Sequence, residues 1–583
     1  MFCSRQKPED KIIVQSSTNP TLCCYYFLNS GLLKRAAVQE SLRIFAIIIF
    51  QDQNLAMQKQ IILKVLPSEA ADAAKLTTLI AGAAAVKAAQ VTGYHILKKS
   101  IDARGRQVWI QLTLQAFIDE PFVPLTPAKL QLQDVHQAAH KAIVVGAGPA
   151  GLFAALRLIE EGIQPIVLER GKDVRARRRD LAAMNKEGIV NAESNYCFGE
   201  GGAGTYSDGK LYTRSSKRGD IQRILNIFVQ YGADEKILYE AHPHIGTNKL
   251  PHIITAIREG IEACGGQVLF QKKVTDFIIK EGAIKGVKTA DGDTFDAGAV
   301  VLATGHSARD IFQLLQDKKL KIEAKPFALG VRVEHPQALI DSAQYHCDVR
   351  SEYLPPASYS LVQQVSGKGV FSFCMCPGGI IAPAATAPGE VVVNGWSPSK
   401  RNNPFANSGM VVSIEEADMK PFAKWGALAG MHFQHSVEQK AFTAGGGKLV
   451  APAQRLVDFT KNTTSASLPD CSYLPGIHAA DLRYVLPSFV YQSLQTAFKE
   501  FGKKLKGYYT NEAVVVATES RTSSPVRIPR DAETLQHPQV VGLYPCAEGA
   551  GYAGGIVSAA MDGERIATKI AEQFAAHRLS KGN

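Results

Sequence analysis

Apolar runs and an apolar helical stripe alternate in one part of the chain. Residues 142–145 and 165–168 are short and wholly apolar, as buried parallel strands are. Between them, apolar residues recur at helical spacing through 152–159. A helix between two short buried strands predicts a βαβ unit and a parallel sheet.

A small unit precedes this βαβ pattern. Alternating residues predict strands over 60–66 and 107–118, and an alanine-rich stretch between them predicts a helix over 69–88. Residues 121–140 contain three of the prolines and read as a linker. Residues 1–56 lack periodicity and stay unassigned. Met57 directly precedes the first strand, and we hypothesise that it is the working start.

The region after the βαβ unit alternates between helices and strands. The last two strands of this region turn at Asp291-Gly292, a strong hairpin signal. The pattern predicts amphipathic helices over 220–240 and 251–264 and strands over 267–270, 274–279, 284–289, 294–296 and 299–303.

From residue 326 the pattern changes to mixed strands, loops and prolines, and near 516 it returns to strand, glycine-rich turn and helix. We therefore predict an α/β fold with a Rossmann-like domain that is discontinuous in sequence, an inserted mixed α+β domain and a small α+β N-terminal domain. The expected parts are 57–120, 121–140, 141–325, 326–515 and 516–583.

Composition narrows the class of protein. The chain has 583 residues, 46% hydrophobic residues and a net charge of +11, which suit a soluble protein of two or three domains and give no separate argument for nucleic acid. Its ten cysteines are scattered without a CxxC pair, as in a reducing compartment. No apolar run reaches the ~18 residues of a membrane helix. We expect a cytoplasmic protein.

The glycines after residue 145 carry the first chemical signal. Gly146 permits a tight turn, Gly148 lets backbone approach a pyrophosphate, and Gly151 lets the helix pack on the strand. A helix N-terminus favours phosphate. Glu169 ends the second strand and can accept hydrogen bonds from an adenosine ribose. Together these residues predict a dinucleotide-binding site.

An arginine-rich stretch follows, over residues 170–179. Arg170 and its neighbours could neutralise cofactor phosphates or an anionic substrate, or could lie on an exposed helix face. Both interpretations stay open.

Two more glycine-rich stretches are candidates for ligand binding. Gly201, Gly202 and Gly204 belong to a loop with flanking aromatic residues, in which backbone can pass close to a flat ligand. The second stretch, 546–563, forms a strand, a glycine turn and a helix that begins near Gly555. Residues 299–305 end a strand in small residues, where parallel sheets bind ligands.

Histidines and cysteines give weaker signals. His242 and His244, with His252 nearby, lack a carboxylate or cysteine at ligand spacing, so we expect no metal there. Cys374 and Cys376 would share one face of a strand. We interpret them as packed thiols and keep a redox dithiol as the alternative.

The motifs GAGPAG, Ala303-Thr304-Gly305 and Ala547-Glu548-Gly549, in this order, resemble the glutathione-reductase-like FAD-binding superfamily. More closely, GEGGAGTYSDGKL, AHPHIGT, FCMCPGG, ESRTSSPVRI and CAEGAGYAGGI are similar to a bacterial family of largely uncharacterised FAD-dependent dehydrogenases, over roughly residues 60–575.

The resemblance implies an FAD site. The glycines at 146, 148 and 151 would hold the pyrophosphate, Glu169 the ribose, Val274 the adenine edge, Glu548 the ribityl chain, and the helix after Gly555 the pyrimidine end. The expected FAD contacts are Gly146, Gly148, Pro149, Ala150, Gly151, Glu169, Arg170, Gly201, Gly202, Gly204, Val274, Ala303, Thr304, Gly305, Glu548, Gly555 and Ile556.

We expect an FAD-dependent oxidoreductase that moves a hydride through flavin N5, with the substrate between the Gly199–Lys210 loop and the 326–515 domain. Candidate proton-transfer residues are His306, Tyr206 and Tyr552, and Arg521 could anchor an anion. Each could equally be a structural hydrogen-bonding group. The substrate would be a small molecule, with an anion as one option. No second dinucleotide unit follows residue 326, so NAD(P)H would dock transiently if it is the electron donor.

Two alternatives stay open. One is a flavin monooxygenase or a reductase of a conjugated double bond. The other is an FAD-carrying RNA-associated protein whose small domain offers a basic cluster, Lys98, Lys99, Arg104 and Arg106; a solvated surface is the commoner role of such a cluster.

Overall fold

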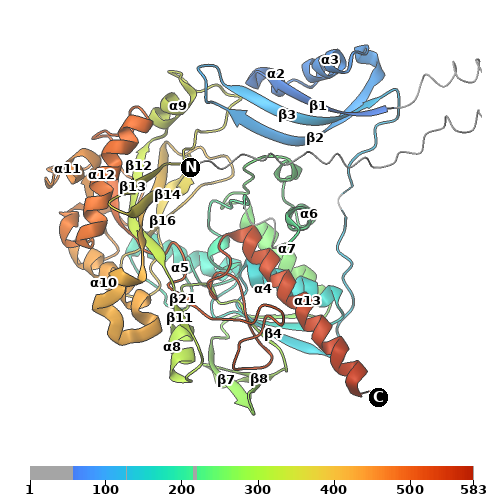
Figure 1. Cartoon of the computed structure of the whole chain (residues 1–583), viewed down its shortest axis with the longest axis vertical. Helices are drawn as coiled ribbons and strands as arrows, with labels where there is room; N and C mark the ends of the chain where they lie inside the picture. Colours follow the sequence, from blue (N-terminus) through green and yellow to red (C-terminus); the bar gives the residue numbers. More distant parts are fainter. Residues whose placement is uncertain (1–56, 127, 214–218, 582–583) are drawn as a thin grey trace, which may run out of the picture.

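The computed structural model describes residues 57–126, 128–213 and 219–581. The unassigned segment 1–56 lies outside the described residues, so the hypothesis about Met57 stays a prediction. Figure 1 shows a small domain above a larger body in which two sheet regions lie side by side.

The small domain is a three-stranded antiparallel sheet with helices on one face. Its strands lie in the order β1 (Met57–Val65), β3 (Trp109–Ile118) and β2 (Val91–Asp102). α2 (Pro67–Ala70) and α3 (Ala73–Ala84) cover the sheet (Figure 1). The alternating apolar residues of β1 and β3 are the ones that α3 buries.

The helix predicted over 69–88 is wrong in its extent. Helix α2 ends at Ala70, and a separate helix, α3, begins at Ala73. The Asp72 side chain caps α3 by accepting hydrogen bonds from the backbone N–H groups of Ala74 and Lys75. An aspartate is a strong N-cap, and this cap outweighs the helix propensity of the surrounding alanines.

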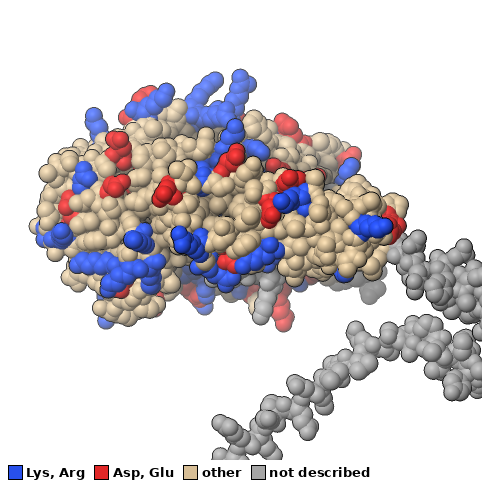
Figure 2. All heavy atoms as spheres, turned by 90° about the horizontal axis from the view of Figure 1, so that it is seen from above, with Lys and Arg blue, Asp and Glu red and all other residues tan. Residues whose placement is uncertain are grey.

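The edge strand β2 joins the small domain to the body. Lys99 N–H donates to the carbonyl of Tyr239 at 2.8 Å, and Ala241 N–H donates to the carbonyl of Lys99 at 2.9 Å. In the basic cluster of this domain, Arg104 forms two 2.8 Å hydrogen bonds with Asp102. Figure 2 shows Lys and Arg side chains spread over one face of the molecule, with Asp and Glu between them.

The first sheet of the body is parallel and five-stranded. Its order is β22 (Leu543–Pro545), β10 (Val300–Leu302), β4 (Lys141–Val145), β5 (Gln164–Leu168) and β6 (Gln267–Leu269). β22 comes from the far end of the chain, so the domain is discontinuous in sequence, as predicted. The β4, β5 and β10 runs are buried on both faces, as parallel strands are.

Helices cover one face of this sheet. α4 (Pro149–Glu160), α7 (Leu250–Ala263) and α13 (Ile556–Lys581) pack on Ala142, Val144, Val167 and Val301. α13 crosses α4 so closely that a Cβ at Gly563 would lie 2.1 Å from the carbonyl oxygen of Ala150.

An antiparallel meander covers the other face. It consists of β7 (Val274–Lys280), β8 (Ala283–Thr289) and β9 (Thr294–Asp296), with α8 (Arg309–Asp317) beside it. The hairpin predicted at Asp291-Gly292 joins β8 to β9. Gly292 adopts φ +94°, a conformation that glycine reaches without steric cost.

The second large sheet is mixed and belongs to the central domain. The strand β20 spans the predicted boundary at residue 515 and pairs with β12 and β18. The order is β13 (Val362–Val365), β14 (Lys368–Cys376), β17 (Phe405–Ile414), β12 (Phe327–Pro336), β20 (Val514–Glu519), β18 (Ala451–Arg455) and β19 (Ile477–Ala479).

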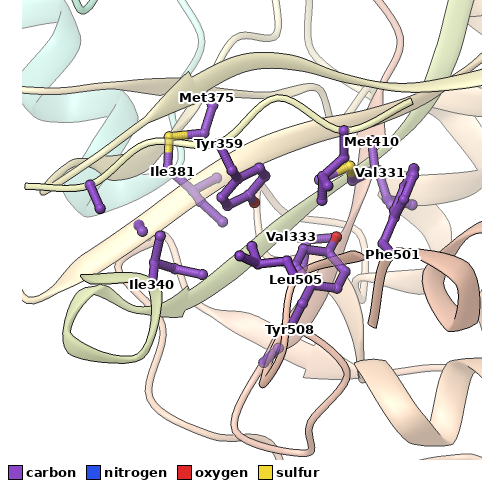
Figure 3. Close-up of a cluster of buried hydrophobic side chains, with 14 of the residues drawn as sticks. Val331, Val333, Ile340, Tyr359, Met375, Ile381, Met410, Phe501, Leu505 and Tyr508 are labelled. Atoms are coloured by element: carbon purple, nitrogen blue, oxygen red, sulfur yellow. The ribbon is translucent and has the colours of Figure 1, made fainter. Parts of the chain in front are cut away.

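The two faces of β12 have different functions. Figure 3 shows Val331 and Val333 in the buried cluster with Met410 of β17 and with Phe501, which lies in a helix. Alternate residues point the other way because side chains alternate across a strand, and these include Arg332, which is fully buried. One face thus forms the core, and the other carries charge toward the interior of the protein.

The remaining elements pack around these sheets or connect them. Within the described residues no helix is long and apolar enough to cross a membrane. The other helices are α5 (Val174–Glu187), α6 (Ile221–Gln230), α9 (Gln337–Tyr345), α10 (Ala429–Ala444), α11 (Leu456–Thr460) and α12 (Ser488–Lys504), and the other strands are β11 (Glu323–Ala324), β15 (Ile380–Pro383), β16 (Val393–Trp396) and β21 (Val526–Arg527). The helix predicted over 220–240 ends earlier, at Gln230, and a short 3₁₀ turn, Glu235–Leu238, follows it.

Candidate functional site

A cavity of about 320 Å³ runs from the carboxyl ends of the parallel strands to the central sheet. Its volume lies in the range of small-molecule sites, roughly 300–1,000 Å³. Val145 and Leu168 line it at the ends of β4 and β5, and Phe373 and Trp396 line it from the central domain. Two domains therefore share the site.

The glycines of the turn after β4 have two roles: two of them allow close backbone packing, and one leaves space in the cavity. A Cβ at Gly146 would lie 2.5 Å from the carbonyl oxygen of Ala303, and one at Gly151 would lie 1.9 Å from that of Gly146. These two glycines permit close backbone packing. A Cβ at Gly148 would meet no described heavy atom within 4 Å, and Gly148 lines the cavity. Space for a ligand is thus left at Gly148, whereas Gly151 packs behind the turn.

Two helix N-termini meet at the cavity. Pro149 and Ala150 begin α4, and Gly555 and Ile556 stand at the start of α13; all four line the cavity. No side chain caps α4 at Gly148. Free N–H groups at helix starts favour phosphate and other negative charge.

Glu169 is buried and lies at the centre of three backbone segments. Its carboxylate accepts hydrogen bonds from the backbone N–H groups of Ala147, Gly171 and Gly199, each at 2.9 Å. A carboxylate offers about four acceptor positions, so one remains for a ribose hydroxyl. Glu169 therefore fixes the glycine turn and the 199–204 loop relative to each other, in addition to lining the cavity.

Arg170 lines the cavity, but carboxylates hold its charge. Its guanidinium donates to Glu193 at 2.6 Å and to Asp310 at 2.8 Å, and it lies 4.2 Å from the centre of the Phe198 ring. Its surroundings therefore fix its position, and it is not a free phosphate-binding cation.

Arg177, from the same arginine-rich stretch, holds the glycine loop. Its side chain is fully buried on α5. Its hydrogen bonds within the described chain go to the backbone carbonyls of Asn195, Tyr196, Glu200 and Gly202, at 2.8–3.0 Å. Burial lowers the pKa of Arg177. The alternatives left open for this stretch were neutralisation of cofactor phosphates or an anionic substrate, and an exposed helix face. Arg177 has none of these roles, whereas Arg175, Arg178 and Arg179 are exposed on α5.

The three glycines predicted in the loop lie differently. Gly202 and Gly204 line the cavity, where a Cβ at Gly202 would approach Gly148 Cα to 3.2 Å. Gly201 lies behind them and donates its N–H to the carbonyl of Ala147 at 2.8 Å. It adopts φ +76° and supports the turn from outside the cavity lining.

The turn after β10 adds small residues to the cavity wall. Ala303, Thr304 and Gly305 line it, together with Val274 at the start of β7. Thr304 Oγ1 is buried and has no hydrogen-bond partner among the described residues, so it can accept one from a ligand. A Cβ at Gly305 would meet nothing within 4 Å.

Two of the proposed acid–base residues line the cavity, and one does not. His306 Nδ1 lies 3.4 Å from Glu548 Oε1, and both residues line the cavity. Tyr206 also lines it, but its hydroxyl donates to the carbonyl of Val174 at 3.1 Å and burial raises its pKa. Tyr552 lies away from the lining, where its hydroxyl accepts a hydrogen bond from Arg530 N–H at 3.0 Å.

Arg521 lines the cavity, and its guanidinium group belongs to a buried ion-pair network. Its guanidinium contacts Glu390 at 2.7 Å and Glu438 at 3.1 Å. Arg309 of α8 donates to both oxygens of Glu438 at 2.9 Å. His435 lies 3.5 Å from Glu390, but the two arginines already compensate these carboxylates, so we assign no metal there. The network ties helix α8, which packs beside the parallel sheet, to the central domain.

The central-domain end of the cavity carries a different cluster. Asp208 Oδ2 accepts a hydrogen bond from Arg401 at 2.9 Å and lies 3.7 Å from Lys210 Nζ. Burial raises the pKa of Asp208, but Lys210 and Arg401 outweigh it and hold the pKa at about 2. Burial lowers the pKa of Lys210, but nearby Cys376 and Asp208 raise it overall. Both groups are therefore charged at neutral pH.

Cys374 and Cys376 do not share a face, so that prediction is wrong. The register of β14 against β17 shifts between Phe373 and Cys376, and Cys374 adopts φ +43°. This β-bulge turns Cys374 into the cavity and leaves Cys376 buried. Cys376 Sγ lies 3.6 Å from both Lys210 Nζ and Arg332 Nη2.

Several lining residues were not among the predicted site residues. Asp208 and Lys210 lie in the Gly199–Lys210 loop that we expected to hold the substrate, although the sequence did not single out either residue as a contact. No local pattern identifies the central-domain residues, because they reach the cavity only through the packing of distant strands. The lining residues outside that loop that were not predicted as contacts include Tyr196, Cys197, Phe198, Lys272, Lys273, Phe373, Cys374, Asn394 and Trp396.

Parts of the sequence match models of known families. Residues 139–183 match the model of an FAD binding domain, and residues 326–522 match the model described as FAD-dependent protein, C-terminal domain-like. Residues 252–325 match that of glucose inhibited division protein A, and residues 57–117 match a domain of unknown function. An uncharacterised protein of Clostridium beijerinckii is 39% identical over 502 residues, 83% of this chain and 93% of that one.

The chain belongs to a family of FAD-dependent proteins. An FAD-binding domain joined to the C-terminal domain of FAD-dependent proteins places it among the flavin oxidoreductases. The residues present fit FAD, because Gly148 leaves open space at the start of α4, which no side chain caps, and because the buried Thr304 hydroxyl has no partner among the described residues.

More distant relatives are similar over part of the chain. Protein FixC of Salmonella typhi is 26% identical over 34% of this chain and 44% of its own length. Among solved structures, a geranylgeranyl bacteriochlorophyll reductase-like protein of Thermoplasma acidophilum is 12% identical over 75% of this chain and 80% of its own, with a TM-score of 0.33. L-proline dehydrogenase of P. horikoshii is 13% identical over 74% and 94%, with a TM-score of 0.31.

Proposed function

We propose that this flavoprotein is a dehydrogenase or reductase that transfers a hydride between flavin N5 and a small molecule in the cavity. The observation that carries the proposal is the continuity of the cavity. It runs from the glycine turn at Gly148 to Asp208, Lys210 and Cys374 at the central sheet. The flavin ring of FAD would occupy the space beyond the phosphate-binding end, and the central-domain end, lined by Asp208, Lys210 and Cys374, would then receive the second, reacting molecule.

FAD supplies reversible two-electron transfer when it is bound. The protein's own residues would hold it: Gly148 and the α4 start would receive the pyrophosphate and Glu169 the ribose, and the α13 start at Gly555 would favour negative charge. His306 and Glu548 both line the cavity, and a proton can pass between the His306 imidazole and the Glu548 carboxylate.

Three residues from the sequence-based list are weaker candidates for proton transfer or anion binding. Arg521 already contacts two carboxylates, Tyr206 donates to a backbone carbonyl, and Tyr552 lies away from the lining. We therefore retain His306 as the candidate acid–base residue from that list.

The test is an absorption spectrum of the purified, FAD-loaded protein, followed anaerobically after addition of NADPH or NADH. Bleaching of the flavin bands supports a nicotinamide-driven oxidoreductase, and a persistent oxidised spectrum points to another electron donor. Failure to bind FAD would overturn the proposal. Oxygen consumption coupled to a hydroxylated product would replace hydride transfer to a substrate with the monooxygenase alternative.

A further inference from the structure

The cations that line the cavity are not equivalent. Four of the five are each paired with two carboxylates in the described structure. Arg170 and Lys273 both contact Glu193 and Asp310, Lys272 contacts Asp291 and Asp293, and Arg521 contacts Glu390 and Glu438.

Lys210 is the exception among these cations. The carboxylate nearest to its ammonium group is that of Asp208, 3.7 Å away, and Arg401 binds the same carboxylate more closely, at 2.9 Å. Two cations thus share one carboxylate, which leaves one positive charge in the cluster. Burial lowers the pKa of His244 to about 4, so this neighbouring ring adds no charge at neutral pH.

Asp208 provides the second, independent observation. The residue is 3% exposed and lines the cavity. Its Oδ2 faces Arg401 and Lys210, whereas its Oδ1 is buried and has no hydrogen-bond donor among the described residues. Burial of an ionised oxygen without a donor is costly, so Oδ1 is poised to accept a hydrogen bond from a bound molecule.

We propose that Lys210 binds the carboxylate of the substrate and that Asp208 Oδ1 accepts a hydrogen bond from a hydroxyl or amino group of the same molecule. This substrate class is a small hydroxy or amino carboxylic acid. The two protein groups are adjacent, because Lys210 Nζ lies 3.7 Å from the other oxygen of Asp208. One small molecule can therefore contact both.

The surroundings of the pair suit such a ligand. The Lys210 side chain is 37% exposed in the cavity, so its ammonium group can be reached. Cys374 and Trp396 line the neighbouring wall. Burial raises the pKa of the Cys374 thiol to about 11, so this wall is neutral at physiological pH and does not repel an anion.

This inference rests on the proposed function, because it assigns the substrate of the same cavity. The experiment first reads the flavin content of the protein from its absorption spectrum. Protein that binds no FAD would count against the proposed function, and the ligand titration would then be read on the apoprotein.

Calorimetry on the FAD-loaded protein measures the binding of three matched probes. Glycolate carries both groups, acetate lacks the hydroxyl, and ethylene glycol lacks the carboxylate. We expect glycolate to bind more tightly than acetate and ethylene glycol not to bind. Equal binding of the three, or no binding of either acid to the wild type, would overturn the proposal.

Variants then assign the two contacts. Lys210→Met should lower the affinity for both glycolate and acetate by at least about tenfold, since a hydrogen bond to a charged group contributes roughly that factor or more to binding. Lys210→Arg should retain binding. Asp208→Asn should reduce the preference for glycolate over acetate. Lys272→Met is the matched control, because Lys272 lines the same cavity but is paired with two aspartates.

A second measurement separates substrate binding from an effect on the cofactor. The flavin reduction potential is measured for the wild type and for Lys210→Met. If Lys210→Met lowers the potential but leaves the affinity for acids unchanged, the lysine acts on the flavin and the proposal fails. If the variant does not fold, Lys210→Gln takes its place in both measurements.

Discussion

Arg177 donates its Nη2 hydrogen to the carbonyl oxygen of Gly202 at 2.9 Å, although the arginine is fully buried and Gly202 lies in the glycine loop that lines the FAD cavity. A permanently charged side chain thus acts as a fixed set of donors for a segment that has little regular structure of its own. The loop geometry depends on a residue of α5 that does not line the cavity.

The first prediction follows from this contact. Arg177→Met should lower the free energy of unfolding by roughly 3 kcal/mol or more, since it leaves buried carbonyls without donors. FAD affinity should fall with it. Urea unfolding and flavin fluorescence titration measure the two effects. Arg179→Met, at an exposed position of the same helix, is the control and should change neither. Unchanged FAD binding in Arg177→Met would contradict this role.

The second prediction separates folding from cofactor binding at the glycine turn. Gly148→Ala should fold normally, because the added Cβ meets no described atom within 4 Å, but it should weaken FAD binding by filling the open space. Gly151→Ala should not give stable protein, because its Cβ would lie 1.9 Å from a backbone oxygen. Thermal melting of the apoproteins and FAD titration distinguish these results. An unaltered FAD Kd in Gly148→Ala would place the pyrophosphate elsewhere.

The third prediction concerns the ion-pair network of Arg521. Arg521→Met should lower the free energy of unfolding by about 3–5 kcal/mol. The substitution leaves the buried carboxylates of Glu438 and Glu390 with too little positive charge beside them. The measurement is urea unfolding at pH 7 with saturating FAD. Lys503→Met removes an exposed ion pair with Glu500 and should change stability by less than about 1 kcal/mol.

The fourth prediction is the pH dependence of the same network. Burial raises the pKa values of Glu390 and Glu438, but Arg521 and Arg309 outweigh it and hold both below the ordinary value. Carboxylates with lowered pKa values stabilise the fold above the unfolded value of ~4.3, and this stability is lost as the pH falls. Wild-type Tm should therefore drop steeply below about pH 5. Arg521→Met should show a shallower drop; an identical slope would rule out this origin.

The fifth prediction uses Cys374 as a reporter of the cavity. Cys374 is exposed to the cavity, whereas Cys376 and Cys546 are buried. Cys374 faces the cavity but is enclosed by the protein, and this burial raises its thiol pKa to about 11. Its alkylation should therefore be slow at pH 7 and accelerate up to about pH 11. Bound FAD or substrate should slow it. Mass spectrometry of alkylated peptides measures the rates; faster labelling of Cys376 than of Cys374 would show that the bulge is misplaced.

The sequence alone predicted the dinucleotide-binding half of the site. Gly146, Gly148, Gly151 and Glu169 could be identified because the βαβ unit is local: strand, turn, helix and acid follow one another within a few dozen residues, and backbone sterics fix what each must be. For the same reason the return of the chain to the parallel sheet near β22 could be predicted from its strand and glycine turn.

The tertiary structure decided which charged groups are available. Arg521 and Arg170 are paired with carboxylates from distant segments, whereas Lys210 shares a single carboxylate with Arg401. These ion pairs cannot be predicted from local sequence, because they form between residues that meet only when the two large sheets pack together. The face that Cys374 presents was likewise set by a bulge in β14 against β17. Local pattern thus determined the cofactor, and long-range packing determined the chemistry beside it.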